Sequence, residues 1–223
     1  MTDATRFVDL SHTIESGMVT YKGLPAPLIC DHLSREASRA TYAPGTEFHI
    51  ARIDMVANTG TYLDTPFHRY ADGIDLAGLK LGTIADLPGV VVRVPAAAER
   101  AIDMMHFAGI EIKGRAVLVN TGWDRHWRTD SYFEGHPFLT EAAAILLRDN
   151  GAVLVGIDSY NIDDVSGGTR PVHSVLLKAG IPIVEHLTGL GALPVDGFRF
   201  SAIPPKISGM GTFPVRAHAR IDG

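Results

Sequence analysis

Apolar residues gather in short runs along this chain, and segments rich in glycine, proline and charged residues separate the runs. Residues 89–94, 116–120 and 152–157 are the clearest runs, each dominated by valine, leucine, isoleucine or alanine. Runs of this length and composition are typical of strands buried on both faces, as happens where helices cover a sheet. Further strands are expected at residues 7–10, 48–56, 181–184, 198–203 and 212–219.

Two segments have the pattern of helices instead. Thr140 can cap a helix from 141 to 150 that Gly151 ends, and a second short helix is expected from 172 to 178. Strands outnumber helices and do not alternate with them regularly, so the pattern predicts a mixed α/β fold with a substantial sheet core. Between residues 16 and 27, glycines and prolines among apolar residues predict an ordered loop, which in an oligomer could cover a neighbour's site.

Length and composition fit one domain over residues 1–223. The chain has 223 residues and is 46% hydrophobic and 20% charged, as expected of an ordinary globular protein. Its 20 basic and 25 acidic residues give a net charge of −5 without long blocks of one sign, so neither nucleic acid nor a membrane surface is an expected partner. The N-terminal residues have no apolar core of signal-peptide length, so a cytoplasmic location is expected.

Cys30 is the only cysteine of the chain. An internal disulfide and a thiolate metal cluster within one chain are therefore excluded. Cys30 itself is expected to be a small buried apolar residue. Any metal would rest on histidine and carboxylate ligands.

The densest chemistry in the sequence lies between Asn58 and His68. Asp64 and His68 are four residues apart, and Pro66 between them removes a backbone donor and fixes its own φ, which excludes a regular helix. Together with Gly60 this predicts a rigid loop that holds a carboxylate and an imidazole in place, as a preorganised site requires. The alternative is a turn whose aspartate caps a helix and whose histidine lies on the surface.

This segment resembles the His-x-Gly-Thr-His-x-Asp-x-Pro-x-His signature of the cyclase family of metal-dependent hydrolases, which includes bacterial kynurenine formamidases and isatin hydrolases. Asn58 and Tyr62 stand where the signature has histidines, and the residues that fit it are Gly60, Thr61, Asp64, Pro66 and His68. The resemblance continues in residues 8–12, 156–158 and 214–217 and so spans most of the chain. It implies the family's swivelling β/β/α fold and a homodimer or homotetramer.

The resemblance also implies a divalent metal, zinc or manganese. Asp64 matches the carboxylate of the signature, and His173 and Glu185 match the histidine and glutamate that complete the family's second metal site. His68 matches the final histidine of the signature, the family's acid/base group. An imidazole, with an unperturbed pKa of about 6.5, can take a proton from water and return it to a leaving amine. A structural histidine is the alternative for His68.

The loss of two family histidines at Asn58 and Tyr62 leaves three arrangements open. One ion remains at the three matching ligands, or His49 or His136 supplies a substitute ligand, or the site holds no metal. In the third arrangement Asn58 and Tyr62 donate hydrogen bonds to a bound carbonyl or carboxylate. Tyr62 could bind a metal only as phenolate, from an unperturbed pKa of about 10. We favour a single ion.

The favoured function is hydrolysis of a small amide or lactam by an arylformamidase-like enzyme, with N-formylkynurenine, an intermediate of tryptophan catabolism, as the first candidate substrate. Asn58 is a predicted substrate-binding residue. So is Trp123, in an aromatic segment with Trp127, Tyr132 and Phe133 that could form a wall for a ring-bearing substrate. The alternative for this segment is a loop packed on the surface.

Two other classes of function stay open from the sequence. One is a metal-independent lyase or isomerase that uses His68 as base and Tyr62 as acid, and whose activity chelators would not diminish. The other is a non-catalytic small-molecule-binding protein on the same scaffold. The retained ionisable residues argue against this second class, because several such groups in one cleft have little use without chemistry.

Overall fold

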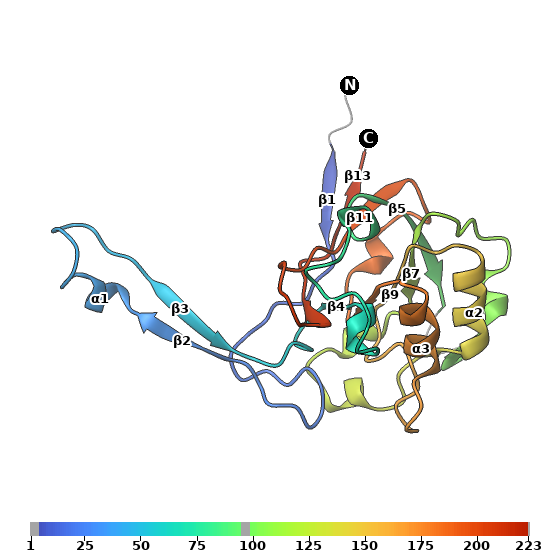
Figure 1. The fold of residues 1–223 in the computed structure, drawn as a ribbon, viewed down its shortest axis with the longest axis horizontal. Helices are drawn as coiled ribbons and strands as arrows, with labels where there is room; N and C mark the ends of the chain where they lie inside the picture. Colours follow the sequence, from blue (N-terminus) through green and yellow to red (C-terminus); the bar gives the residue numbers. More distant parts are fainter. Residues whose placement is uncertain (1–4, 95–98, 223) are drawn as a thin grey trace.

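The computed structural model describes residues 5–94 and 99–222. Its main feature is a nine-stranded mixed sheet (Figure 1). In spatial order the strands are β1 (Arg6–Asp9), β13 (His218–Ile221), β11 (Phe198–Ser201), β5 (Leu87–Arg93), β7 (Ala116–Asn120), β9 (Leu154–Ile157), β10 (Ile183–Glu185), β4 (Tyr62–Asp64) and β12 (Thr212–Pro214). The predicted mixed α/β fold with a large sheet is confirmed.

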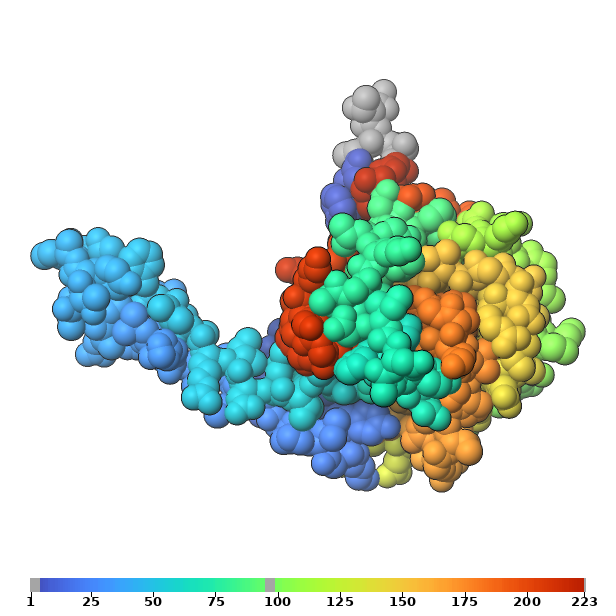
Figure 2. Space-filling model, in the orientation of Figure 1, coloured from blue at the N-terminus to red at the C-terminus, as the bar shows by residue number. Residues whose placement is uncertain are grey.

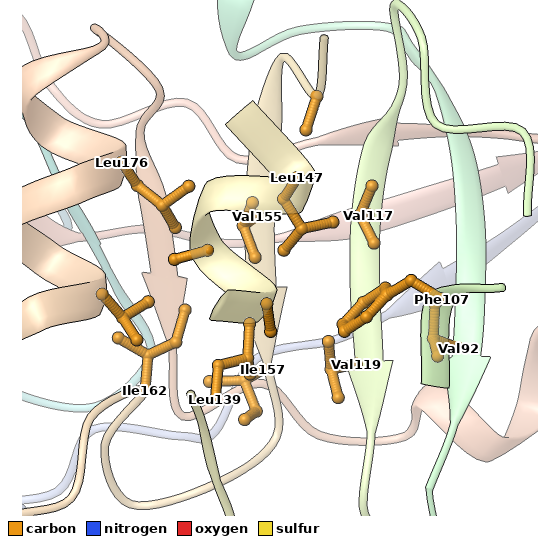
Figure 3. Packing of buried hydrophobic residues seen from close by; sticks show 14 of the residues in the cluster. Val92, Phe107, Val117, Val119, Leu139, Leu147, Val155, Ile157, Ile162 and Leu176 are labelled. Carbon is orange, nitrogen blue, oxygen red and sulfur yellow. The ribbon is translucent and has the colours of Figure 1, made fainter. Parts of the chain in front are cut away.

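The four central strands, β5, β7, β9 and β10, are parallel, and the strands on both sides of them are antiparallel. Helices α2 (Glu141–Asp149) and α3 (Pro171–Lys178) pack together on one face of these strands (Figure 1). Alternate side chains of each central strand enter two different cores. Val117 and Val119 point into the core under the helices (Figure 3), while Ala116 and Leu118 point into the core on the other face.

The ends of helix α2 agree with the sequence pattern. The Thr140 hydroxyl accepts a hydrogen bond from the backbone N–H of Ala143 at 3.2 Å, which satisfies one free donor of the first turn. The same hydroxyl donates to Asp103 Oδ1 at 2.8 Å. Gly151, just after the helix, has the positive φ of 77° that favours glycine.

Two predicted segments differ from the structure. Residues 212–219, expected as one strand, form β12 and β13, which lie at different places in the sheet, because Val215 and Ala217 between them enter the second core. The segment from Asn58 to His68, expected as a loop, contains strand β4 and the short 3-10 helix η1 (Pro66–His68).

A two-stranded arm projects from the body of the molecule (Figures 1 and 2). It consists of β2 (Leu28–Leu33) and β3 (Ile50–Asp54), with the one-turn helix α1 (Arg35–Ser38) near its far end. The sequence pattern predicted β3 but not β2. Cys30 lies on β2 and is exposed, so its predicted burial was wrong. Cys30 is exposed because the whole of β2 projects away from the core.

The remaining elements are short. Strands β6 (Ala101–Ile102) and β8 (Phe138–Leu139) form a small parallel pair. The other 3-10 helices are η2 (Leu81–Thr83), η3 (Met104–Phe107), η4 (Trp123–His126), η5 (Asp130–Phe133) and η6 (Leu190–Ala192). Among the described residues, no helix combines the length and the apolar character that crossing a membrane requires.

Replacement of Thr140 by alanine is expected to destabilise the fold, since it removes the cap of α2 and the hydrogen bond to Asp103. A lost N-cap costs about 1 kcal/mol, which lowers the Tm of a chain of this size by about 2–4 °C. Thermal unfolding followed by circular dichroism measures the change. Thr46→Ala, at an exposed position in the loop of the arm, is the control and is expected to leave the Tm unchanged. An equal effect of the two substitutions would contradict the cap.

Candidate active site

Strand β4 positions the first residues of the site. It lies antiparallel between β10 and β12, and the register sets Tyr62 opposite Glu185 and Asp64 opposite Thr212. Because side chains alternate along a strand, Tyr62 and Asp64 share one face of the sheet. Leu63 between them points to the other face and enters the second core. The buried side chain of Leu63 therefore fixes strand β4 in the core, and the alternation along the strand holds Tyr62 and Asp64 on the opposite face.

Glu185 is buried and both of its carboxylate oxygens accept hydrogen bonds. The Tyr62 hydroxyl donates to Oε2 at 2.6 Å, and the backbone N–H of Ile162 donates to Oε1 at 2.6 Å. Burial raises the pKa of Glu185 to about 7, and the nearby charge of Asp64 acts in the same direction, against the lowering effect of His173. The positive charge near Glu185 is therefore too small to offset the cost of burying its carboxylate.

Tyr62 is a neutral hydrogen-bond donor in this environment. Burial and the charges of Glu185 and Asp64 raise the pKa of its phenol well above the usual value, while a hydrogen bond with Asn58 acts in the opposite direction. The phenolate needed for metal ligation is thus disfavoured. A raised pKa also makes Tyr62 a weaker acid, which counts against its use as a proton donor.

His173 lies in the first turn of α3 and is fixed by Asp163. Its Nδ1 is 2.6 Å from Asp163 Oδ2, and the same carboxylate accepts from the backbone N–H groups of Val172 and His173. The imidazole Nε2 therefore faces Asp64 Oδ2 and Glu185 Oε1, each 3.7 Å away. Burial by itself lowers the pKa of His173, but the hydrogen bond to Asp163 and the nearby carboxylates of Asp64 and Glu185 outweigh it and raise this pKa to about 10.

Thr212 links Asp64 to His68. Its Oγ1 lies 2.5 Å from Asp64 Oδ1 and 2.8 Å from His68 Nδ1. An ionised carboxylate can only accept, so the hydroxyl donates to Asp64 and accepts from the Nδ1–H of His68. This arrangement fixes the tautomer of the neutral imidazole and leaves Nε2 as the nitrogen that takes up a proton. The His68 side chain is 35% exposed, whereas that of Asp64 is 0% exposed.

The donor set fits a divalent metal ion. Asp64, His68 and His173 each offer a ligand atom, and these atoms all lie within 4.8 Å of one another. Asp64 Oδ2 is buried and has no hydrogen-bond partner, which is costly for a carboxylate oxygen unless a cation faces it. The contact between His173 and Asp163 is the outer carboxylate–histidine pair that orients metal-binding imidazoles. Glu185 lies beside this group through its contact with His173.

A cavity of about 400 Å³ opens over these residues. It is lined by Tyr21, Lys22, Gly23, Leu24, Asn58, Tyr62, His68, Arg69, Asn161, Arg170, His173 and Glu185. The lining brings together Asn58, Tyr62 and His68 of the signature segment with the distal His173 and Glu185, whereas the buried Asp64 does not line the cavity. It also carries three basic side chains, which the sequence did not single out.

The aromatic segment after β7 lies elsewhere. Trp123 does not line the cavity, and its indole N–H donates to the backbone carbonyl of Tyr132 at 3.0 Å. Trp127 stacks on His12 with ring centroids 3.9 Å apart, and the buried Tyr132 hydroxyl lies 2.9 Å from His186 Nδ1. These aromatic residues pack against histidines of the body, so the segment is not a wall of this cavity.

The two substitute ligands considered from the sequence are also placed elsewhere. His49 pairs with Asp31 on the arm at 2.8 Å. His136 is buried, and its Nδ1 lies 3.0 Å from the carbonyl of Pro137. Neither belongs to the group that could hold an ion. Conversely, Thr212 was missed, since a threonine 148 positions from its partner Asp64 gives no local signal.

A comparison of the chain with known families gives the same family as the signature segment. The model of the Cyclase family matches residues 8–164. The chain belongs to the cyclase family. The predicted family is thereby confirmed, although two signature histidines are replaced.

Individual relatives match over most of the chain. A kynurenine formamidase of Bacillus cereus is 24% identical over 218 residues, covering 97% of this chain and 98% of the relative. A kynurenine formamidase of Geobacillus thermodenitrificans is 27% identical over 183 residues, covering 82% and 85%.

Solved structures show the same fold. A potential metal-dependent hydrolase with cyclase activity superposes with a TM-score of 0.80 at 25% identity, covering 99% of this chain and 100% of that chain. Isatin hydrolase A of Labrenzia aggregata superposes with a TM-score of 0.81 at 21% identity, covering 98% and 94%. The predicted cyclase-like fold is therefore confirmed.

Gly211 lies against the backbone of His68. A Cβ atom at this position would overlap the backbone N and Cα of His68. Gly211→Ala is therefore expected to displace His68 and to cost about 1–3 kcal/mol of stability, as overpacking does. Chemical denaturation measures the stability, and the NMR signals of the His68 ring report the displacement. Gly191→Ala, where a Cβ would have no neighbour within 4 Å, is the matched control. Unchanged His68 signals in Gly211→Ala would contradict the close approach.

Proposed function

We propose that this cyclase-family protein is a metal-dependent hydrolase of small amides. The observation that carries the proposal is the buried, unpartnered Oδ2 of Asp64, which faces the Nε2 of an imidazole held in place by Asp163. A divalent cation satisfies both atoms at once. The relatives named kynurenine formamidase and the metal-dependent hydrolase of the same fold support this class of activity.

Asp64, His173 and Glu185 are the proposed ligands of one ion, zinc or manganese. Two carboxylates would neutralise its charge, and the ion would supply the positive charge that the buried Glu185 lacks. Tyr62 favours one ion over two, because its neutral hydroxyl already binds Glu185 where the family signature has an imidazole. When bound, the ion supplies Lewis acidity that polarises a carbonyl and acidifies water.

His68 is the proposed proton carrier. Thr212 holds its Nδ1, and its Nε2 is free to take a proton from an attacking water and to give it to the leaving amine. The partial exposure of the ring lets it exchange protons with solvent between reactions. Thr212 therefore acts as a positioning residue that couples the base to the ligand Asp64.

The substrate proposed first is N-formylkynurenine, whose formamide matches the names of the relatives. The floor of the cavity is acidic through Glu185, with Asp64 beneath it. Its wall carries Lys22, Arg69 and Arg170. An aryl formamide that bears a carboxylate fits this division, with its carbonyl at the floor and its carboxylate at the basic residues. Asn58, beside Tyr62, remains the proposed polar contact to the substrate.

Metal content and formamidase activity, measured on the wild type and on single variants, test the proposal. Wild type is expected to hold about one ion per chain and to hydrolyse N-formylkynurenine. Asp64→Asn, His173→Gln and Glu185→Gln are expected to lose the ion. His68→Gln is expected to keep the ion while kcat falls about 10²–10⁴-fold, as for the loss of a general acid/base. Retention of the ion in Glu185→Gln with its loss in His68→Gln would exchange the roles of these two residues.

The outcome that overturns the mechanism is full activity after complete chelation, which would direct attention to a metal-independent lyase or isomerase. Lys178→Gln, at an exposed position on the far turn of α3, is the control for nonspecific effects of substitution. It is expected to keep both the ion and the activity.

The raised pKa of His173 makes metal binding depend on pH. With a pKa of about 10, the metal-free protein carries a proton on His173 throughout pH 6–8, and the ion must displace it. Affinity is therefore expected to rise with pH by about tenfold per unit for one displaced proton. Isothermal titration calorimetry in buffers of different ionisation enthalpy counts the released protons. Asp163→Asn, which removes a contact that raises this pKa, is expected to release fewer. No proton release in the wild type would contradict the assignment.

A further inference from the structure

Asn161 is a buried residue of the cavity floor that the proposed mechanism does not use. It is 5% exposed and lines the cavity together with Glu185 and His173. Its Oδ1 accepts a hydrogen bond from the backbone N–H of Asp163 at 2.9 Å, and its Nδ2 donates to Glu185 Oε2 at 3.4 Å. The amide of Asn161 therefore lies against the carboxylate of a proposed metal ligand and faces the cavity.

The orientation of this amide is fixed by its neighbours. A backbone N–H can only donate, so the atom of Asn161 that faces Asp163 N is the oxygen, and the nitrogen is left for Glu185 and the cavity. The side chain of Ile162 is buried in the core under the helices, and its backbone N–H donates to Glu185 Oε1 at 2.6 Å. The Asp163 carboxylate holds His173. The Asn161 amide is thus aligned with both distal ligands before a substrate binds, as a preorganised donor requires.

One N–H of this amide has no acceptor among the described residues. Nδ2 carries two hydrogens, and Glu185 Oε2 is its one partner in that part of the chain. The same oxygen accepts from the Tyr62 hydroxyl at 2.6 Å, so the 3.4 Å contact of Asn161 is the weaker of the two. A buried donor without an acceptor costs about 1–3 kcal/mol. Because Asn161 lines the cavity, a substrate bound there can supply the missing acceptor.

Two other polar groups of the site have their protons committed elsewhere. The single proton of the Tyr62 hydroxyl lies in the hydrogen bond to Glu185, and the Nδ1–H of His68 donates to Thr212. In the proposed reaction His68 Nε2 takes the proton of the attacking water, so it begins the reaction as an acceptor. Asn161 is therefore free to donate to a carbonyl oxygen, whereas these two groups are not.

We propose that Asn161 is a catalytic residue that donates a hydrogen bond to the carbonyl oxygen of the scissile amide. This role rests on the proposed hydrolase function and extends it. As water adds to the carbonyl carbon, its proton passes to His68 Nε2, and the electron pair of the C=O π bond moves to the oxygen, which becomes negative. The free N–H of Asn161 stabilises that charge. When the C–N bond breaks, the C=O bond forms again and His68 gives its proton to the leaving nitrogen.

A donor of this kind acts mainly on kcat. Its hydrogen bond strengthens as the oxygen gains charge, so the transition state is stabilised more than the bound substrate. An amide also suits this position because it is neutral. It adds no third negative charge beside Asp64 and Glu185, and so it can donate to an anionic oxygen without changing the charge of the site.

Kinetics and metal content of Asn161→Ala and Asn161→Ser, measured with N-formylkynurenine, test this role. In both variants kcat is expected to fall about 10²–10³-fold, as for the removal of one oxyanion donor, while KM and the bound ion are unchanged. The serine hydroxyl can still accept from the backbone N–H of Asp163, as such hydroxyls do in turns, but it is shorter than the amide. The serine variant therefore separates the loss of the donor from a disturbed loop, and far-UV circular dichroism checks the fold of both.

Replacement of the carbonyl oxygen of the substrate by sulfur gives a second readout, because sulfur is a weak hydrogen-bond acceptor. The ratio of kcat for N-formylkynurenine to kcat for its thioformyl analogue is expected to be at least several-fold larger in the wild type than in Asn161→Ala. If Asn161 only positioned Glu185, both rates would fall together and the ratio would not change.

Asn150→Ala is the matched control. Asn150 is exposed at the end of α2 and does not line the cavity, so this variant is expected to keep both kcat and the ion. Wild-type kcat in Asn161→Ala, loss of the ion from that variant, or an equal fall of kcat in the control would each overturn the catalytic role and leave the proposed function standing. A wild type that hydrolyses no amide would overturn both.

Discussion

The antiparallel register between β4 and β10 is the constraint on which the site depends. It sets Tyr62 against Glu185 and keeps Asp64 on the same face, with Leu63 fixed in the core behind them. A shift of one residue would turn Leu63 into the cavity and bury both polar side chains in the apolar core. The burial of Leu63 in the core therefore fixes the register of β4 and with it the positions of Tyr62 and Asp64.

The arrangement concentrates charge where the protein has little water to screen it. Two carboxylates and one imidazole meet in a buried space, and the balance among them is incomplete, as the raised pKa values of Glu185 and His173 show. Such a centre is stabilised either by protons or by a cation. A metal ion and protons thus compete for the same residues. Which of them occupies the site depends on the metal concentration and the pH.

Much of the fold could be read from local pattern. The apolar runs at 116–120 and 152–157 and the cap at Thr140 depend on neighbours in sequence, and the structure confirms them. Strand β2 of the arm could not be predicted in this way, because it mixes polar and apolar residues without the alternation of a half-buried strand. The split of residues 212–219 was also missed, because only the packing of Val215 and Ala217 in the core separates the two strands.

The candidate site was predictable to a similar extent. The signature pointed to Asp64 and His68, but the role of Tyr62 depends on a hydrogen bond to a residue 123 positions away.

The first and last strands of the described chain are neighbours. β1 pairs with β13, and Thr212, which joins Asp64 to His68, comes from β12 near the end of the sequence. A growing chain contains all the acidic and imidazole groups of the site before it contains the threonine that aligns them. Contacts of such large sequence separation also form late and slowly. The aligned centre can therefore form only after residue 212 has been added to the chain.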